Sequence, residues 1–131
     1  MSTELTMLVA TTVLCMLLPG VYGYGRANTP GGLEWGLGNR DAAIEFPAWV
    51  GRAERAHRNL LENLPPFAVL ILVAVIARET NWLTAMAAVV FFFARVAHAV
   101  IYVAGTTSGA RTVAYGVGMF AELLILLKLV F

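Results

Sequence analysis

The chain alternates between long uncharged apolar runs and short polar segments. The first run lies between Glu4 and Arg26. It is long enough to cross a bilayer, because a hydrocarbon core of about 30 Å needs roughly 20 helical residues. We therefore expect a membrane-spanning helix over about 4–25. No Lys or Arg precedes this run, which favours a retained helix over a cleaved signal peptide, since signal peptides begin with a basic region.

A polar segment at 26–47 follows, rich in Gly, Pro, Asn and charged residues and without a helical period. We predict one long loop there and a second helix over about 48–78. The uncharged run of that helix, from Asn63 to Ala77, covers only about 22 Å at about 1.5 Å per residue. The second helix must therefore carry Glu62 to hydrocarbon depth.

Two more apolar segments, at about 82–105 and 109–131, complete the chain, and a short loop that includes Thr107 joins them. Four crossings with short connections predict an all-α membrane protein. We expect one domain over 1–131, folded as a four-transmembrane-helix up-down bundle.

Composition supports this class. The chain is 60% apolar and 13% charged, with a mean hydropathy of +0.77, whereas soluble domains are about half apolar and a quarter charged. This apolar composition excludes a soluble enzyme and a disordered tail. A nucleic-acid binder is excluded as well, since the net charge is only +1. The single cysteine, Cys15, fits inert packing, and the sequence predicts no metal site.

The basic residues predict the orientation. In an up-down bundle most of them lie on one side: Arg26, Arg40, Arg52, Arg55, Arg58 and Arg111, against Arg78 and Lys128 on the other. Because cytoplasmic loops carry the excess of positive charge, we expect the first and third loops in the cytoplasm and both termini outside. A bacterial inner membrane is the expected location.

Polar residues recur on one face of three helices. At about 100° per residue, the residues of each face lie within about 60° of one another. These faces hold Arg55, Asn59 and Glu62 on the second helix, Arg95, His98 and Tyr102 on the third, and Arg111, Tyr115 and Glu122 on the fourth.

Charged groups at membrane depth normally face a bundle interior, a partner or a wet cavity. We predict a structural ion pair between Glu62 and Arg95, which lie at similar depth. Too few acids remain for the other donors, which favours an anionic ligand with a carboxylate or thiolate over hydrogen bonds between helices. These donors are Arg55, Arg58, Asn59, His98, Tyr102, Arg111 and Tyr115.

Four sequence blocks resemble the MAPEG family, the membrane-associated proteins in eicosanoid and glutathione metabolism. They are ERAHRNLLEN at 54–63, PPF at 65–67, ARVAHAVIY at 94–102 and RTVAY at 111–115. The resemblance implies a homotrimer that binds glutathione between neighbouring subunits on the cytosolic side. It also implies that the sulfur is attached to a lipophilic electrophile, or that a peroxide is reduced or isomerised.

The resemblance also implies roles for individual residues. It assigns the glutathione contacts to Arg58, Asn59, Glu62, His98, Tyr102, Arg111, Thr112 and Tyr115, with Arg26 contributed by the adjacent subunit. Arg111 matches the arginine that stabilises the thiolate, with Tyr115 and Thr112 as its catalytic neighbours, although some family members have serine at the position of Thr112. By charge, Arg55 and Arg58 suit the carboxylates of glutathione and Glu62 its amine. Glu122 lies outside the family pattern.

Two other functions remain open from the sequence. One is a non-catalytic relative that binds a lipid or a partner protein, against which the intact set of donors argues. The other is a small four-helix multidrug exporter. Such an exporter needs a membrane-embedded carboxylate in its first helix, and this chain has none between Glu4 and Arg26.

Overall fold

The computed structural model describes residues 1–106 and 108–131 and contains four long helices in this part of the chain. They are α1 (Thr3–Ala27), α3 (Ala48–Ile76), α4 (Trp82–Ala104) and α5 (Ser108–Val130), with a short α2 (Gly32–Leu37) between the first two. All four long helices are sufficiently long and apolar to cross a membrane. The all-α class and the four expected crossings are confirmed. Thr107, in the expected loop before the last helix, lies outside the described residues.

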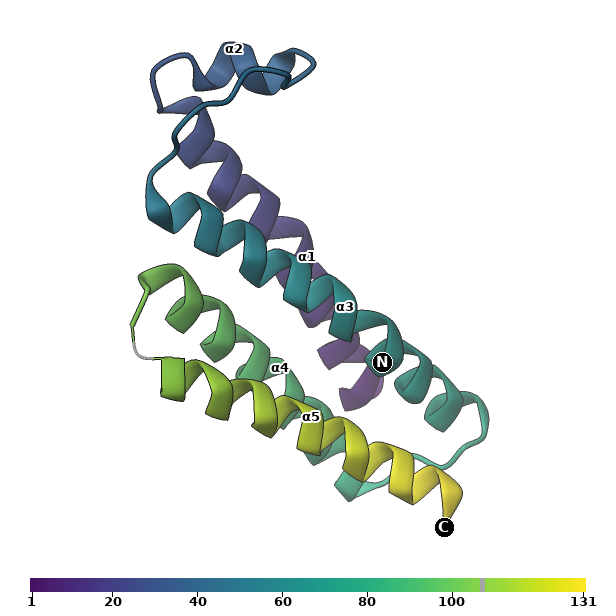
Figure 1. Cartoon of the computed structure of the whole chain (residues 1–131). Helices are drawn as coiled ribbons and strands as arrows, with labels where there is room; N and C mark the ends of the chain where they lie inside the picture. Colours follow the sequence, from purple (N-terminus) through teal and green to yellow (C-terminus); the bar gives the residue numbers. More distant parts are fainter. Residues whose placement is uncertain (107) are drawn as a thin grey trace.

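The helices form an up-down bundle in which α1 packs along α3 and α4 packs along α5 (Figure 1). The segment with α2, the end of α4 and the start of α5 lie at one end of the bundle, and the C-terminus lies at the other (Figure 1). Arg52, at the start of α3, donates from Nε to the carbonyl oxygen of Val103, near the end of α4, at 3.0 Å. This hydrogen bond fixes two polar helix ends at the same level.

The apolar core lies where α3, α4 and α5 meet. Phe67 and Phe91 stack there with ring centroids 3.9 Å apart, and Ile71, Ala121 and Ile125 pack around them. Alanines at helix contacts allow the backbones to approach closely, which is how membrane helices gain packing energy. Cys15 is a free thiol buried in a second cluster with Leu18, Leu60 and Ala99.

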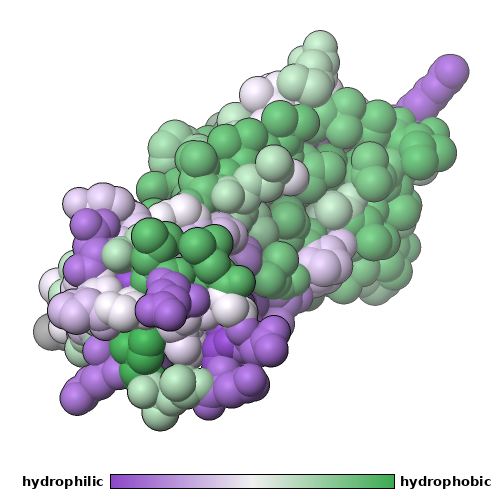
Figure 2. Space-filling model, turned by 90° about the horizontal axis from the view of Figure 1, so that it is seen from above, coloured by the Kyte–Doolittle hydropathy of each residue, from purple (hydrophilic) through white to green (hydrophobic). Residues whose placement is uncertain are grey.

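The outer surface follows the membrane assignment. Figure 2 shows a mostly hydrophobic surface along the length of the bundle and a concentration of hydrophilic residues at one end. Large apolar side chains such as Met16, Leu17, Phe93 and Phe120 are exposed on this surface. An apolar surface of this extent is typical of contact with lipid or with another subunit.

A buried polar contact joins α1 to α4 at the other end of the bundle. Thr84 donates from Oγ1 to Oε1 of Glu4 at 2.7 Å, and both side chains are buried. Thr84 also belongs to a capping box with Asn81, which begins α4. The carboxylate of Glu4, which precedes the first apolar run, therefore accepts a buried hydrogen bond that joins two helices.

The segment predicted as a loop contains one element that the sequence analysis missed. Trp35 of α2 packs edge-on against Phe46, at a centroid distance of 5.1 Å, and donates from Nε1 to the carbonyl oxygen of Ala42 at 2.7 Å. A helix as short as α2 shows no recognisable period in the sequence, because helices of this length depend on tertiary contacts.

Candidate functional site

A pocket of about 260 Å³ lies between three helices near the connection of α4 to α5. It is lined by Asn59 from α3, His98 and Tyr102 from α4, and Arg111, Thr112 and Tyr115 from α5. The sequence analysis assigned all six residues to one ligand, and none of them is acidic. The structure therefore places a set of hydrogen-bond donors and one fixed cation around a single space.

Two arginines make cation–π contacts with Tyr102 at this pocket. The guanidinium carbon of Arg111 lies 4.5 Å from the centroid of the Tyr102 ring, and that of Arg55 lies 5.9 Å from the same centroid. A guanidinium that stacks through its face keeps its N–H donors in the plane of the group. Tyr102 thus orients Arg111 without neutralising it.

His98 forms the inner wall of the pocket. Its ring is buried and lies 5.5 Å from the ring of Tyr102 and 6.1 Å from that of Tyr115, measured between centroids. His98 and Tyr102 are four residues apart on α4, so they lie on the same helical face. The aromatic rings of α4 and α5 meet around the imidazole and restrict its rotation.

Arg95 forms hydrogen bonds to two of the residues that line the pocket. Its side chain is only 1% exposed. It donates from Nη1 to Oδ1 of Asn59 and from Nη2 to the carbonyl oxygen of Tyr115, both at 3.3 Å. Gly118 provides the space, because a β-carbon there would lie 2.9 Å from Cζ of Arg95. One side chain of α4 therefore binds both α3 and α5 at the floor of the site.

The predicted ion pair between Glu62 and Arg95 is wrong. Glu62 is exposed, and the carboxylate whose charge acts on Arg95 is that of Glu122 in α5. The reason is the rotation of α3, which buries Leu60, Asn63 and Phe67. Glu62 precedes Asn63 by about 100° around the helix and so points away from the bundle.

Glu122, which had no partner in the sequence analysis, is buried opposite Arg95. The two are not within ion-pair distance. Oε1 of Glu122 and Nε of Arg95 are two of the three buried side-chain atoms without a hydrogen-bond partner in the described part of the chain. The pair therefore interacts through charge and not through a hydrogen bond.

The remaining candidate residues lie outside the pocket of the single chain. Arg58 and Glu62 are exposed on α3. Arg26, at the end of α1, donates from Nη2 to Oε2 of Glu54 at 2.8 Å, and its guanidinium carbon lies 4.8 Å from the centroid of the Tyr22 ring. Within one chain, Arg26 belongs to a separate cluster at the α2 end of the bundle.

The sequence model of the MAPEG family matches residues 3–131, nearly the whole chain. The chain belongs to the MAPEG family. A comparison with curated protein sequences found no match. MAPEG membership indicates a membrane protein with a glutathione-related function, which agrees with the four candidate crossings. In residues 1–106 and 108–131, no three His, Cys, Asp or Glu side chains group closely enough to hold a metal ion.

Proposed function

We propose that this MAPEG protein is an integral membrane, glutathione-dependent transferase or peroxidase that acts on lipophilic electrophiles. The observation that carries the proposal is the pocket itself, in which one arginine, one imidazole, two phenols, an amide and a hydroxyl surround about 260 Å³ without a lining acid. This donor set suits an anionic, polar ligand rather than a lipid tail.

The chemistry of glutathione depends on its sulfur. A thiol with a pKa of about 8.5 is mostly protonated at neutral pH, and the thiolate is the nucleophile. Glutathione supplies a thiolate sulfur that replaces the leaving group of the electrophile, while its thiol proton is released to water. Arg111 keeps its positive charge and would stabilise an anionic sulfur in the pocket.

The other pocket residues orient the ligand. Tyr102 holds Arg111 by stacking, and Arg95 fixes the side chain of Asn59. Tyr115 and Thr112 present hydroxyl groups on the same side of α5 as Arg111. In this proposal they donate to the sulfur or to the oxygen of a peroxide.

The rest of glutathione extends beyond the pocket in this proposal. Arg55 and Arg58, both exposed on α3, would bind its two carboxylates, and Glu62 would accept its α-amine. A homotrimer would bring Arg26 from the adjacent subunit. Its assembly would also bury polar faces that four helices alone leave partly open.

The electrophile would come from the membrane. An apolar groove of about 410 Å³ runs between α1 and α4, lined by residues such as Leu18, Val21 and Val100. A lipophilic substrate gains free energy from such a lining. We further propose that the pocket end of the bundle faces the cytoplasm of a bacterial cell, where soluble glutathione can reach it.

Conjugation of glutathione to a hydrophobic chloronitrobenzene by the purified protein tests this function. We expect turnover that requires glutathione, and an oligomeric mass equal to three chains by light scattering with detergent correction. Glutathione binding without turnover of either an electrophile or a lipid hydroperoxide would instead favour the non-catalytic relative. The absence of both glutathione binding and turnover would refute the proposal.

A further inference from the structure

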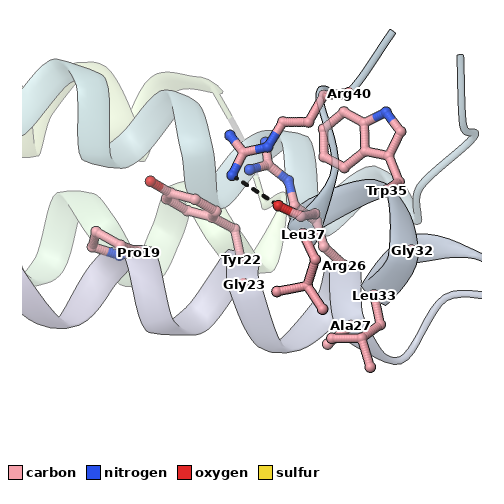
Figure 3. A pocket seen from close by; sticks show the side chains of 11 residues that line it. Pro19, Tyr22, Gly23, Arg26, Ala27, Gly32, Leu33, Trp35, Leu37 and Arg40 are labelled. Carbon is pink, nitrogen blue, oxygen red and sulfur yellow. Dashed lines mark hydrogen bonds between the residues drawn. The ribbon is translucent and has the colours of Figure 1, made fainter. Parts of the chain in front are cut away.

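A second cavity, of about 340 Å³, lies at the end of α1 beneath α2. Tyr22 and Arg26 of α1, Trp35 of α2 and Arg40 of the following loop contribute to its lining. Figure 3 shows the Arg40 side chain reaching back from the loop toward α1. The cavity is distinct from the pocket around Arg111, with which it shares no lining residue.

The charge of this cavity depends on Arg40. Arg26 is already neutralised by Glu54 at 2.8 Å, whereas Arg40 takes part in neither of the two ion pairs found in the described ranges. Its Nη2 donates to the carbonyl oxygen of Gly36 at 3.4 Å, and its Cζ lies 5.5 Å from the centroid of the Trp35 ring. No residue that lines this cavity is acidic, whereas Glu34 and Asp41 line the adjoining cavity that Arg40 also borders.

The backbone at Arg40 has a conformation that is rare for a residue other than glycine. Its φ is 63°, in the left-handed region that favours glycine, and residues kept in that region cluster at ligand sites. The only other non-glycine residue with positive φ in the described ranges is Arg78, in the turn at the opposite end of the bundle. This turn offers a control for the effect of the conformation itself.

The cavity lies at the end of a spanning helix, where a membrane boundary is expected. The spanning helix α1 ends at Ala27, and Leu33 and Leu37 of α2 are 59% and 82% exposed. Exposed leucines beside arginines at the end of a crossing are typical of an element that lies at the level of lipid headgroups. Phosphate groups are the anions concentrated at that level.

We propose that this cavity binds the phosphate of an anionic lipid headgroup, with Arg40 as its main cation. The acyl chains would run past Leu33 and Leu37 along the outside of α1. A free phosphate ion presents the same chemistry, so the source has to be separated by experiment. The inference does not depend on the glutathione chemistry proposed above.

Native mass spectrometry of the detergent-solubilised full chain tests this site. The wild type should retain phosphatidylglycerol at least fivefold more than phosphatidylcholine, and Arg40→Gln should abolish the preference while Arg78→Gln keeps it. Equal retention of the two lipids by the wild type, or an unchanged preference in Arg40→Gln, would overturn the proposal. Displacement of the lipid by millimolar inorganic phosphate would assign the site to the free ion, and resistance to it would assign the lipid.

A stability measurement makes the test independent of how the variants fold. Arg40→Gly removes the backbone strain, so its lipid-free midpoint of thermal unfolding should be equal to or higher than that of the wild type, although its preference for phosphatidylglycerol is lost. A lower midpoint together with an intact preference would show that Arg40 serves the fold and not an anion.

Discussion

The guanidinium of Arg111 lies over the ring of Tyr102, with Cζ 4.5 Å from the ring centroid. This contact joins the last turns of α4 to the first turn of α5 at the pocket. Because the contact is stacking rather than an ion pair, Arg111 keeps its full charge while its position is fixed. A cation held in this way is preorganised for an anion that forms during the reaction.

Arg111→Ala should reduce conjugation about a hundredfold or more, because loss of one charge-stabilising donor costs about 2.7–4 kcal/mol in active sites. Most glutathione affinity should remain, since other residues hold the tripeptide. Initial rates at saturating glutathione measure the effect. Tyr115→Phe is the matched comparison, and if it abolishes the reaction while Arg111→Ala does not, the phenol rather than the arginine activates the sulfur.

Gly118→Ala should destabilise the protein by about 1–3 kcal/mol, the usual range for overpacking. The added methyl group would displace the Arg95 guanidinium from its acceptors on Asn59 and Tyr115. The midpoint of thermal unfolding and the glutathione affinity should fall together.

Gly116→Ala is the control for that substitution. A β-carbon at Gly116 meets nothing within 4 Å, so replacing this helical glycine should stabilise by about 0.5–1 kcal/mol. Equal effects of the two substitutions would show that the Arg95 guanidinium relocates freely.

Arg95 and Glu122 should be coupled energetically. Removing one partner of a buried charge pair typically costs about 3–5 kcal/mol, so Arg95→Gln and Glu122→Gln should each be harmful and the double variant milder than their sum. We expect a coupling energy of about 0.5–3 kcal/mol in a double-mutant cycle of unfolding. The same cycle with Glu62→Gln should be additive, since Glu62 is exposed. Coupling to Glu62 but not to Glu122 would contradict the observed geometry.

Glu79, in the turn between α3 and α4, should make the stability of the protein depend on pH. The hydrogen bond from Lys128, at 2.8 Å, and its charge hold the pKa of Glu79 below its ordinary value of 4.5. This contribution to stability is therefore complete above about pH 4.5 and is lost as the pH falls through the lower folded-state pKa. Unfolding midpoints of the wild type and Glu79→Gln should converge below that window. A difference that is constant with pH would exclude the ion pair as its cause. The effect should be small, because the pair lies on the surface.

The sequence predicted the crossings and much of the pocket for a simple reason. Apolar runs have the length of a bilayer, and the helical period places His98 with Tyr102 and Arg111 with Tyr115. Both pairs do line one space in the structure. Their role in binding glutathione stays a prediction.

The errors came from what a helical period leaves undefined. The period says which residues share a face but not how that face is rotated toward the neighbouring helices, so Glu62 was paired with Arg95 although Asn59 and Glu122 face it. Backbone conformation was also out of reach, because nothing in the sequence around Arg40 indicates a positive φ or the short helix before it.

Titration calorimetry with glutathione, repeated in two buffers of different ionisation enthalpy, measures binding and proton release together. We expect that the wild type binds glutathione in the millimolar range or tighter and releases a thiol proton at neutral pH, and that Arg111→Ala binds but releases markedly less. Absence of binding by the folded wild type, or equal proton release by the two proteins, would contradict the claim that this pocket holds glutathione as a thiolate stabilised by Arg111.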